Sequence, residues 1–492
     1  MNRTARSRNA VHGTYGAAAA GHPRAAAAAS AILTRGGNAI DAVIAAQAVI
    51  CVVMPHAAGV GGDMLALVHD RGTTRALTGT GMSPARQPER YATDGGTSIT
   101  VPGIVDAWAT AARLFGRLPL ADSLEEAIRL CDEGIRVEAN LATAVEAQRN
   151  RLVRHGAADW PLLHLAEGER WRQPELARLL RAVAEHGPTA FYRGAAAEAI
   201  ANAVERQGGT LDATDLAGHE TPIAVPVECG WAGGRLSVQP PPTQGTLLAM
   251  VANALDRITT VDHDNLQHVL VELTEAAFAH RDSAARGAAL LDETLDVDVD
   301  RAQNRGGPRA YLHTAGVAVA DSDGMVVSSL VSVFDDFGSG VLVPELGIVL
   351  NNRAGGFTTG DNAPGPRRRP VHTLAPALVA LPNGDVLALA TPGADGQVQT
   401  LIQVLARMRF SGDSLDVAIA APRWRSQDAE LLIEDDHDGA ENLRRRGHII
   451  SPRPAGDDLF GAVVAAGTAD GRPFAAADWR RQTTTGAASW RR

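Results

Sequence analysis

The chain has 492 residues, of which 45% are hydrophobic and only 4% aromatic, and its formal net charge is −10. A chain of this length can bury a large core, as one α/β unit or as two domains, and aliphatic and alanine side chains must fill it. The acidic balance, without a basic stripe, argues against nucleic acid and an anionic membrane as partners. The three cysteines are isolated and lack metal-ligand spacing, so the sequence predicts no metal site and no cofactor.

Residues 1–16 contain several arginines but no apolar stretch of signal-peptide length, so we expect a cytoplasmic protein. Residues 25–54 form the most apolar segment, but polar residues interrupt it, and Gly36, Gly37 and Asn38 stand near its middle. The segment therefore predicts two buried helices joined at that turn, rather than a membrane span.

Helical periodicity marks the first part of the chain, and strand-like runs mark the second. The predicted helices are 124–133, 175–186, 195–207 and 266–286. Residues 291–308 are polar and rich in Asp, Gly and Asn, which predicts an exposed or mobile stretch. The predicted strands are 316–320, 325–333, 347–350, 375–381 and 386–389.

The most informative segment is a predicted hairpin that begins at Thr314. Residues 314–320 and 325–334 have the pattern of strands, and the turn at 321–324 joins them. A Thr hydroxyl is a poor nucleophile alone, but cleavage of the bond before it would free an α-amine that can act as its base. An amine with a pKa of about 7.7 suits that task near neutral pH. On spacing alone, an ordinary strand threonine is the simpler interpretation.

Motifs along almost the whole chain change that interpretation. They include GGNAIDA at 36–42, PHAAGVGGD at 55–63, PPPTQG at 240–245, FGSG at 337–340, GIVLNN at 347–352, TPG at 391–393 and APRW at 421–424. In their order and number these motifs resemble the γ-glutamyltransferase family of N-terminal-nucleophile hydrolases. The resemblance implies an α+β fold, the four-layer αββα sandwich. It also implies self-cleavage between His313 and Thr314 into a large chain (1–313) and a small chain (314–492), intertwined as one domain.

The resemblance also implies the catalytic residues. Thr314 takes the position of the family's nucleophile, and Ser332 that of a hydroxyl that hydrogen-bonds it; the alternative for Ser332 is a surface strand serine. Gly393 and Ala394 match the family's Gly-Gly, whose backbone N–H groups form an oxyanion hole. Ala394 replaces the second glycine, and we expect its N–H to serve equally if its φ is negative.

Four positions depart from the family's γ-glutamyl pocket. Thr80 stands where the family has an Arg that clamps the substrate α-carboxylate, and Gly356 stands where an acidic residue binds the α-amine. Phe334 replaces an Asn, and His372-Thr373 replaces a Ser-Ser pair. With both charged partners absent, a γ-glutamyl compound should be a poor substrate.

The pocket gains Arg353 and a candidate second ligand, His372. A fixed guanidinium close to the nucleophile suits a small carboxylate that has no amine to neutralise. The alternative for Arg353 is a structural ion pair with Asp335 or Asp336. The residues around 352–357 and 369–373 are most similar to the branch of the family that includes oxamate amidohydrolase-like and cephalosporin-acylase-like members.

These features predict a self-processing amidohydrolase or acyltransferase that works through an acyl-enzyme on a small carboxylated amide. Its expected partners are that substrate and the two chains of its own precursor. Whether it forms a homo-oligomer stays open. Three alternatives stay open as well: a true γ-glutamyl hydrolase or transferase, a hydrolase of carbon–carbon bonds next to a carbonyl, and an unprocessed, non-catalytic homologue.

Overall fold

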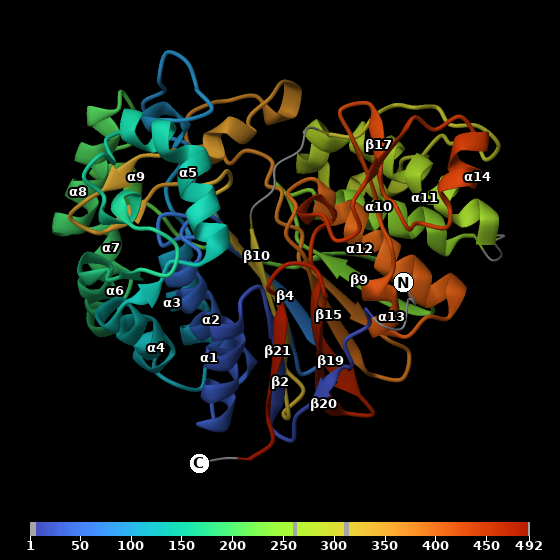
Figure 1. Ribbon diagram of the computed structural model, residues 1–492, viewed down its shortest axis with the longest axis horizontal. Helices are drawn as coiled ribbons and strands as arrows, with labels where there is room; N and C mark the ends of the chain where they lie inside the picture. The colour runs from blue at the N-terminus through green and yellow to red at the C-terminus, as the bar shows by residue number, and fades with distance from the viewer. Residues whose placement is uncertain (1–5, 259–262, 309–313, 491–492) are drawn as a thin grey trace.

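The computed structural model describes residues 6–258, 263–308 and 314–490. Two β-sheets lie stacked in the middle of the molecule, with helices on the outer face of each (Figure 1). The order of layers is therefore helix, sheet, sheet, helix. The predicted α+β fold, a four-layer αββα sandwich, is confirmed.

The first sheet has seven strands in the order β21-β2-β10-β11-β3-β4-β7. Its β10–β11 hairpin begins one residue after Thr314 and pairs antiparallel with Ala315 opposite Val331, so it lies centrally in the sheet, as predicted. The bounds are β2 (Gly16–Ala20), β3 (Asp63–Asp70), β4 (Thr73–Gly79), β7 (Ile223–Ala224), β10 (Ala315–Asp321), β11 (Val326–Ser332) and β21 (Thr484–Ala488).

The second sheet also has seven strands, in the order β1-β20-β19-β15-β14-β9-β8. Both sheets combine strands from before and after position 314. The bounds are β1 (Val11–His12), β8 (Val227–Trp231), β9 (Gly234–Val238), β14 (Ala377–Ala380), β15 (Val386–Ala390), β19 (Val464–Ala469) and β20 (Arg472–Ala477). Smaller sheets pair β5 (Ile135–Arg136) with β6 (Arg170–Trp171), β12 (Leu342–Val343) with β13 (Ile348–Val349), and β16 (Trp424–Gln427) with β17 (Glu430–Glu434) and β18 (Ile450–Arg453).

Small side chains fill the space between the two large sheets. Alanines from β2, β10, β15, β19 and β20 make up most of this core, together with a few Leu and Val residues. Gly316 shows how close the sheets come, because a Cβ at this position would lie 2.9 Å from a methyl of Val464 on the opposite sheet. The start of β10 therefore lies against the end of β15, near the loop that carries Gly393 and Ala394.

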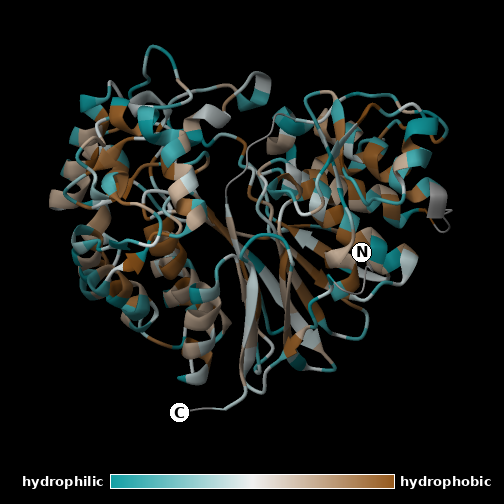
Figure 2. Ribbon diagram, viewed as in Figure 1, coloured by the Kyte–Doolittle hydropathy of each residue, from teal (hydrophilic) through white to brown (hydrophobic). Residues whose placement is uncertain are grey.

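Helices cover both outer faces and bury their apolar sides against the sheets, as the hydropathy colours in Figure 2 show. One layer contains α1 (Pro23–Thr34), α2 (Ala39–Val53), α3 (Ile104–Phe115), α4 (Leu120–Glu133), α5 (Ala139–Arg154), α6 (Pro174–His186), α7 (Thr189–Tyr192), α8 (Gly194–Arg206) and α9 (Ala213–Ala217). The other contains α10 (Gly245–Asp256), α11 (His263–Phe278), α12 (Gly396–Ala406), α13 (Leu415–Ala420) and α14 (Ala440–Arg445).

Most predicted elements are present. The helices expected at 124–133, 175–186 and 195–207 lie in α4, α6 and α8, and residues 25–54 form α1 and α2 on either side of the predicted turn. The helix expected at 266–286 is wrong beyond Phe278. There α11 ends and 3₁₀ turns follow as η4 (Arg281–Asp292), within which Gly287 adopts a φ of 55° that no helix contains.

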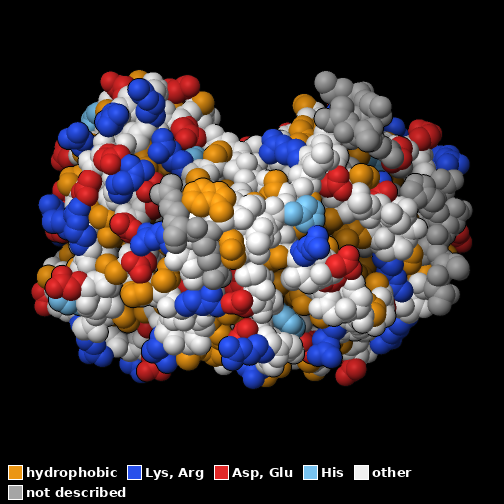
Figure 3. All heavy atoms as spheres, turned by 90° about the horizontal axis from the view of Figure 1, so that it is seen from below, with side chains coloured by type: hydrophobic (Ala, Val, Ile, Leu, Met, Phe, Trp, Pro, Cys, Tyr) orange, Lys and Arg blue, Asp and Glu red, His pale blue; other side chains and the backbone are white. Residues whose placement is uncertain are grey.

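After η4, residues 293–308 form neither helix nor strand, and their side chains are exposed or half-buried, as predicted. Over the face seen from below, basic and acidic side chains are interspersed (Figure 3). Among the described residues, no helix is both long and apolar enough to cross a membrane.

Candidate active site

Thr314 and Ser332 face each other at the open end of the central hairpin. The Thr314 hydroxyl donates to Ser332 Oγ at 3.2 Å, and both side chains are buried. Ser332 Oγ also accepts the N–H of Phe334 at 2.9 Å. Ser332 is therefore not a surface residue, and its hydroxyl is positioned to hold that of Thr314. His313, the other side of the predicted cleavage site, lies outside the described residues.

The backbone at Phe334 is strained. Its φ is 86°, in the left-handed region that a bulky residue rarely adopts. This conformation points the Phe334 N–H at Ser332 and places the ring 4.4 Å from the guanidinium carbon of Arg353. Strain of this kind costs roughly 1–3 kcal/mol and persists only where the surroundings impose it.

Arg353 and His372 meet on one carboxylate, that of Asp63. Arg353 Nε donates to Asp63 Oδ2 at 3.0 Å, and His372 Nε2 lies 3.2 Å from the same oxygen. All three side chains are completely buried. Asp63 is paired with Ser332 in the register of β3 and β11, so both side chains project from the same face of the sheet. The ion pair of Arg353 is therefore with Asp63, and not with Asp335 or Asp336.

The protonation states within this cluster follow from its contacts. His372 Nδ1 accepts the N–H of Leu374 at 3.1 Å, so the ring proton is on Nε2, which donates it to Asp63. Burial, and then the charge of Arg353, lower the pKa of His372 to about 4. Burial acts to raise the pKa of Asp63, but the hydrogen bond from His372 and the charge of Arg353 outweigh it and leave that pKa below its ordinary value. The cluster holds one anion, one cation and a neutral imidazole.

Three polar atoms of the cluster remain unsatisfied. Arg353 Nη1 and Nη2 and Asp63 Oδ1 are buried and make no hydrogen bond to any described residue. Leaving a buried polar group without a partner costs about 1–3 kcal/mol, and more when it is charged. The Nη1 and Nη2 atoms of Arg353 are thus unpaired inside the protein, whereas its Nε is already used, and Arg353 lines neither of the two cavities described below.

The asparagines before Arg353 hold the loop in place. Asn351 Oδ1 accepts the N–H of Arg353 at 3.0 Å, and Asn351 Nδ2 donates to the carbonyls of Gly61 and Thr100. Asn352 Nδ2 donates to Asp335 at 2.8 Å. These side chains position Arg353, since their polar atoms are bound within the protein.

The loop after β15 carries Gly393 and Ala394. Gly393 has a φ of 121° and Ala394 a φ of 48°, so the expected negative φ at Ala394 is wrong. The cause is the tight turn into α12, in which Gly396 and Gln397 donate back to the carbonyls of Gly393 and Ala394. Among the described residues, neither the N–H of Gly393 nor that of Ala394 donates a hydrogen bond, so both remain available to an oxyanion.

Gln244 ties this loop to the segment around His372. Its Nε2 donates to the carbonyl of Ala394 at 2.8 Å and to the carbonyl of Thr373. Thr373 thus contributes a backbone contact that links the two sides of the site, and its side chain is buried.

Thr80 and Gly356 both lie next to the segment around Pro370. Thr80 is buried, and its hydroxyl has no partner among the described residues, while its carbonyl accepts Arg369 Nε at 2.7 Å. Gly356 accepts Asn362 Nδ2 at 2.9 Å through its carbonyl. A Cβ at Gly356 would approach no neighbour closer than 3.4 Å, an ordinary van der Waals contact.

Two cavities adjoin the nucleophile and its surroundings. One, of about 450 Å³, is lined by Thr314, Pro392 and His56, together with polar side chains such as Asn140 and Gln482. The other, of about 570 Å³, is lined by Phe334, Gly355 and Gly356 and by residues 305–308, which precede the predicted cleavage site.

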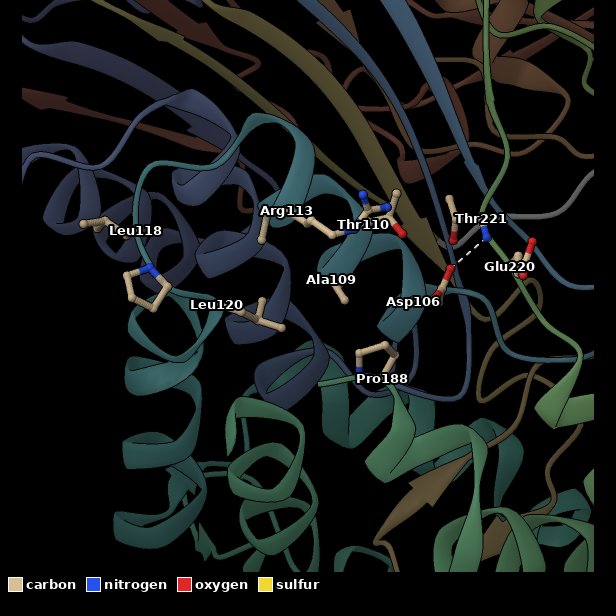
Figure 4. A pocket seen from close by; sticks show the side chains of 11 residues that line it. Asp106, Ala109, Thr110, Arg113, Leu118, Leu120, Pro188, Glu220 and Thr221 are labelled. Atoms are coloured by element: carbon tan, nitrogen blue, oxygen red, sulfur yellow. Dashed lines mark hydrogen bonds between the residues drawn. The ribbon is translucent and has the colours of Figure 1, made fainter. Parts of the chain in front are cut away.

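A wider cavity, of about 730 Å³, lies away from the hairpin (Figure 4). Helix α3 lines one side, and its Asp106 already accepts the N–H of Thr221 at 2.7 Å. The other side is formed by Leu118 and Leu120 and by Pro188. The site residues named above do not reach this cavity.

Sequence reasoning missed Asp63 and Gln244 as parts of the site. Each stands inside a motif, at the end of PHAAGVGGD and within PPPTQG, but neither motif shows which distant residue it contacts. An acidic residue at the start of a buried strand is the signal that could have identified Asp63, because a buried carboxylate requires a partner.

Comparison with known proteins places this site in a family. The gamma-glutamyltranspeptidase family model matches residues 25–488. The oxamate amidohydrolase proenzyme of Klebsiella pneumoniae is 35% identical over 449 residues, which cover 84% of this chain and 85% of that protein. The glutathione hydrolase-like YwrD proenzyme of Bacillus subtilis is 32% identical and covers 92% of this chain and 95% of its own.

A solved structure agrees with these matches. The crystal structure of cephalosporin acylase from Bacillus halodurans superposes with a TM-score of 0.85 at 29% identity, over 98% of this chain and 97% of that one. The predicted family relationship is thus confirmed: this protein belongs to the gamma-glutamyltranspeptidase family and is an enzyme of the N-terminal-nucleophile hydrolase type.

Proposed function

We propose that this enzyme is a self-processing amidohydrolase that uses Thr314 as its nucleophile and acts on a small carboxylated amide. The observation that carries the proposal is the buried Thr314–Ser332 pair at the start of the central hairpin, with an Oγ to Oγ distance of 3.2 Å. A hydroxyl held in this way is oriented for attack and excluded from bulk water.

Processing would come first. Thr314 Oγ attacks the carbonyl carbon of His313, the peptide C–N bond breaks, and the acyl group moves from nitrogen to oxygen as an ester. Water then hydrolyses the ester, which releases the carboxylate of His313 and frees the α-amine of Thr314. The word proenzyme in the names of the two relatives supports this step.

Turnover would reuse the same hydroxyl. The α-amine of Thr314 takes the Oγ proton as Oγ attacks the substrate amide carbonyl, and it then gives a proton to the leaving amine. The oxyanion would be stabilised by the free N–H groups of Gly393 and Ala394. Water, or an acceptor amine, then attacks the acyl-enzyme ester and restores Thr314.

The unpaired nitrogens of Arg353 favour a substrate that carries a carboxylate. Its Nη1 and Nη2 are buried without partners among the described residues, and a substrate carboxylate would satisfy both. Asp63 holds the guanidinium from the Nε side, which fixes the direction of the free edge. One relative in this family is named for the amide of a small dicarboxylate, oxamate.

A γ-glutamyl group fits this pocket poorly. Neither Thr80 nor Gly356 can supply the charge needed for an α-carboxylate or an α-amine. Two lost charge-assisted contacts correspond to about a thousandfold or more in kcat/KM. We therefore infer that this enzyme prefers small carboxylated amides that have no amine.

The test combines intact-mass analysis with a substrate panel. We expect two fragments that join at His313–Thr314, and hydrolysis of an oxalate monoamide or a glutaryl amide at least about a thousandfold faster than that of γ-glutamyl anilide. A single uncut chain would support the non-catalytic alternative. Efficient hydrolysis of glutathione would refute the substrate assignment, and turnover of a β-diketone without any amide would indicate carbon–carbon cleavage.

A further inference from the structure

A second cluster of ligand-type side chains lies in the other helical layer. His268 and Glu272 are four residues apart on α11, and therefore on one face of that helix. His448 reaches them from the loop between α14 and β18. The possible ligand atoms of the three residues all lie within 4.8 Å of one another, and the three side chains are buried.

The hydrogen bonds around His268 orient it as a metal ligand requires. Its Nε2 lies 2.8 Å from the carbonyl oxygen of Asp298, which can only accept, so Nε2 carries the proton. Its Nδ1 then accepts a hydrogen bond from His448 Nε2 at 2.8 Å. A metal would take the place of this hydrogen bond once the His448 proton moves from Nε2 to Nδ1. Anchoring the distal ring N–H on a backbone carbonyl is the usual outer contact of a metal-bound histidine.

Glu272 would complete the set with an oxygen ligand. Its carboxylate already accepts the N–H of Gln303 at 3.0 Å and Arg305 Nη1 at 3.3 Å. A carboxylate has about four lone-pair positions, so a metal can bind while the Gln303 contact persists. Arg305 would move aside, and its guanidinium keeps a second acceptor in the carbonyl of Asp296.

We propose that His268, Glu272 and His448 bind a divalent transition metal of the Zn²⁺ type. Two imidazoles and one carboxylate, with the fourth position left to water, are a known zinc ligand set. The two nitrogens would separate from 2.8 Å to about 3.3 Å, the spacing set by tetrahedral bonds of about 2.0 Å, which a small rotation of His448 provides.

Three protein ligands and an open fourth position are the ligand count of a catalytic rather than a closed structural zinc site, but the metal would also link parts of the chain. His268 and Glu272 precede Thr314 in the chain and His448 follows it, so one ion would connect the two chains that processing produces. It would also hold residues 298–305, whose Asp298 and Gln303 contact two of the ligands. Metal binding itself does not depend on the proposed reaction.

The experiment is metal titration of the full-length protein after dialysis against a chelator. We expect each protein molecule, with its large and small chains together, to bind one Co²⁺ with a visible d–d band typical of tetrahedral ligation. One Zn²⁺ per molecule should displace it. His268→Gln, His448→Gln and Glu272→Gln should each weaken binding by more than about 100-fold, because loss of only an outer contact already costs 10–100-fold.

His186→Gln is the matched control, because it removes an exposed imidazole at the end of α6. It should bind as the native protein does, and so should Thr314→Ala, which separates this site from the catalytic one. Absence of the Co²⁺ band in the native protein would overturn the proposal, even if the cluster variants do not fold. Equal loss of affinity in His186→Gln would overturn it too.

Discussion

At the scale of single residues, Thr314 and Ser332 depend on each other. The Thr314 hydroxyl donates to a Ser332 oxygen that also accepts the N–H of the strained Phe334, so two residues at the end of β11 hold the nucleophile. A hydroxyl positioned in this way has one preferred direction of attack. The two reactions proposed for it, cleavage of its own chain and cleavage of substrate, then differ only in which carbonyl lies before it.

The first prediction concerns Thr314→Ala. Because one Oγ serves both reactions, we expect no cleavage at His313–Thr314 and a loss of turnover of about 10⁴-fold or more, whereas Thr314→Ser should retain part of each. Mass spectrometry and amide hydrolysis measure the two effects. Thr34→Ala, which removes a remote hydroxyl at the end of α1, should change neither. Normal cleavage in Thr314→Ala would exclude this residue from the mechanism.

The second prediction concerns Arg353. Arg353→Ala should lower kcat/KM for an anionic amide by about 100-fold, the equivalent of a lost charge-assisted pair. It also leaves the buried Asp63 without its cation, so the variant should be less stable, but the folded protein should still cleave itself because no free substrate takes part in that reaction. Arg353→Lys should recover only part of the loss, since an ammonium cannot reproduce the guanidinium fork.

The control for Arg353 is Arg235→Ala, which breaks an exposed ion pair with Glu228 and should leave the kinetics unchanged. A neutral analogue of the substrate gives a second control, because its kcat/KM should respond little to Arg353→Ala. If Arg353→Ala turns over the anionic amide as fast as the native enzyme, the carboxylate is bound elsewhere.

At the scale of secondary structure elements, the loop between β15 and α12 has a different backbone conformation from the one expected. The sequence indicated that Ala394 could replace glycine at a negative φ, but the turn into α12 holds it at 48°. Alanine tolerates this region at a cost of about 1 kcal/mol, and a β-branched residue does so much less well.

The third prediction follows from this backbone angle. Ala394→Gly should raise the free energy of unfolding by up to about 1 kcal/mol and preserve activity, because the N–H remains in place. Ala394→Val should destabilise the loop and lower kcat with little change in KM, since it displaces an oxyanion donor and no substrate contact. Chemical denaturation and steady-state kinetics give the two readouts. Equal kcat in all three proteins would remove this N–H from the oxyanion hole.

Strands were harder to predict in the first part of the chain. Residues 17–20 are all alanine, the residue type with the highest helix propensity. They nevertheless form most of β2, between β10 and β21. Ala17 and Ala19 lie between the two sheets, Ala18 and Ala20 lie under the helices, and the ladder to β10 supplies the hydrogen bonds. Tertiary packing therefore decided the conformation against local preference.

At the scale of the whole molecule, one set of buried charges joins segments from before and after Thr314. Asp63 comes from β3, Arg353 and His372 from segments that follow Thr314, and the sandwich encloses all three. Removing one partner of such a set leaves a buried charge without compensation, which typically costs 3–5 kcal/mol. The core of the site and the stability of the fold are thus linked.

The fourth prediction is a pH dependence of stability. Burial lowers the pKa of His372 and of His219 from an ordinary 6.5 to about 4. Between these values the unfolded chain binds protons that the folded chain does not, so stability is complete above pH 6.5 and falls as the pH falls towards 4. Each residue contributes at most roughly 3 kcal/mol to this loss.

Urea unfolding of the uncleaved Thr314→Ala variant at pH 7.5, 6 and 5 measures the effect without separation of the chains. Adding His372→Gln to this variant should make the profile shallower over that range, because one of the imidazoles whose pKa is lowered to about 4 is removed. A free energy of unfolding that stays constant from pH 7.5 to 5 would show that these imidazoles are protonated in the folded protein.

The sequence by itself was sufficient for the family, because its ordered motifs are local patterns that need no knowledge of contacts. The resemblance to that family then implied the αββα sandwich and the central hairpin at Thr314. It also identified Arg353 and His372 as unusual. Only the tertiary structure showed that both residues bind Asp63, that Gln244 connects Thr373 with Ala394, and that His268, Glu272 and His448 meet. Apart from the helical pair His268 and Glu272, these contacts join residues 129 to 309 positions apart. No periodicity in a chain encodes which distant side chains a particular packing of layers brings together.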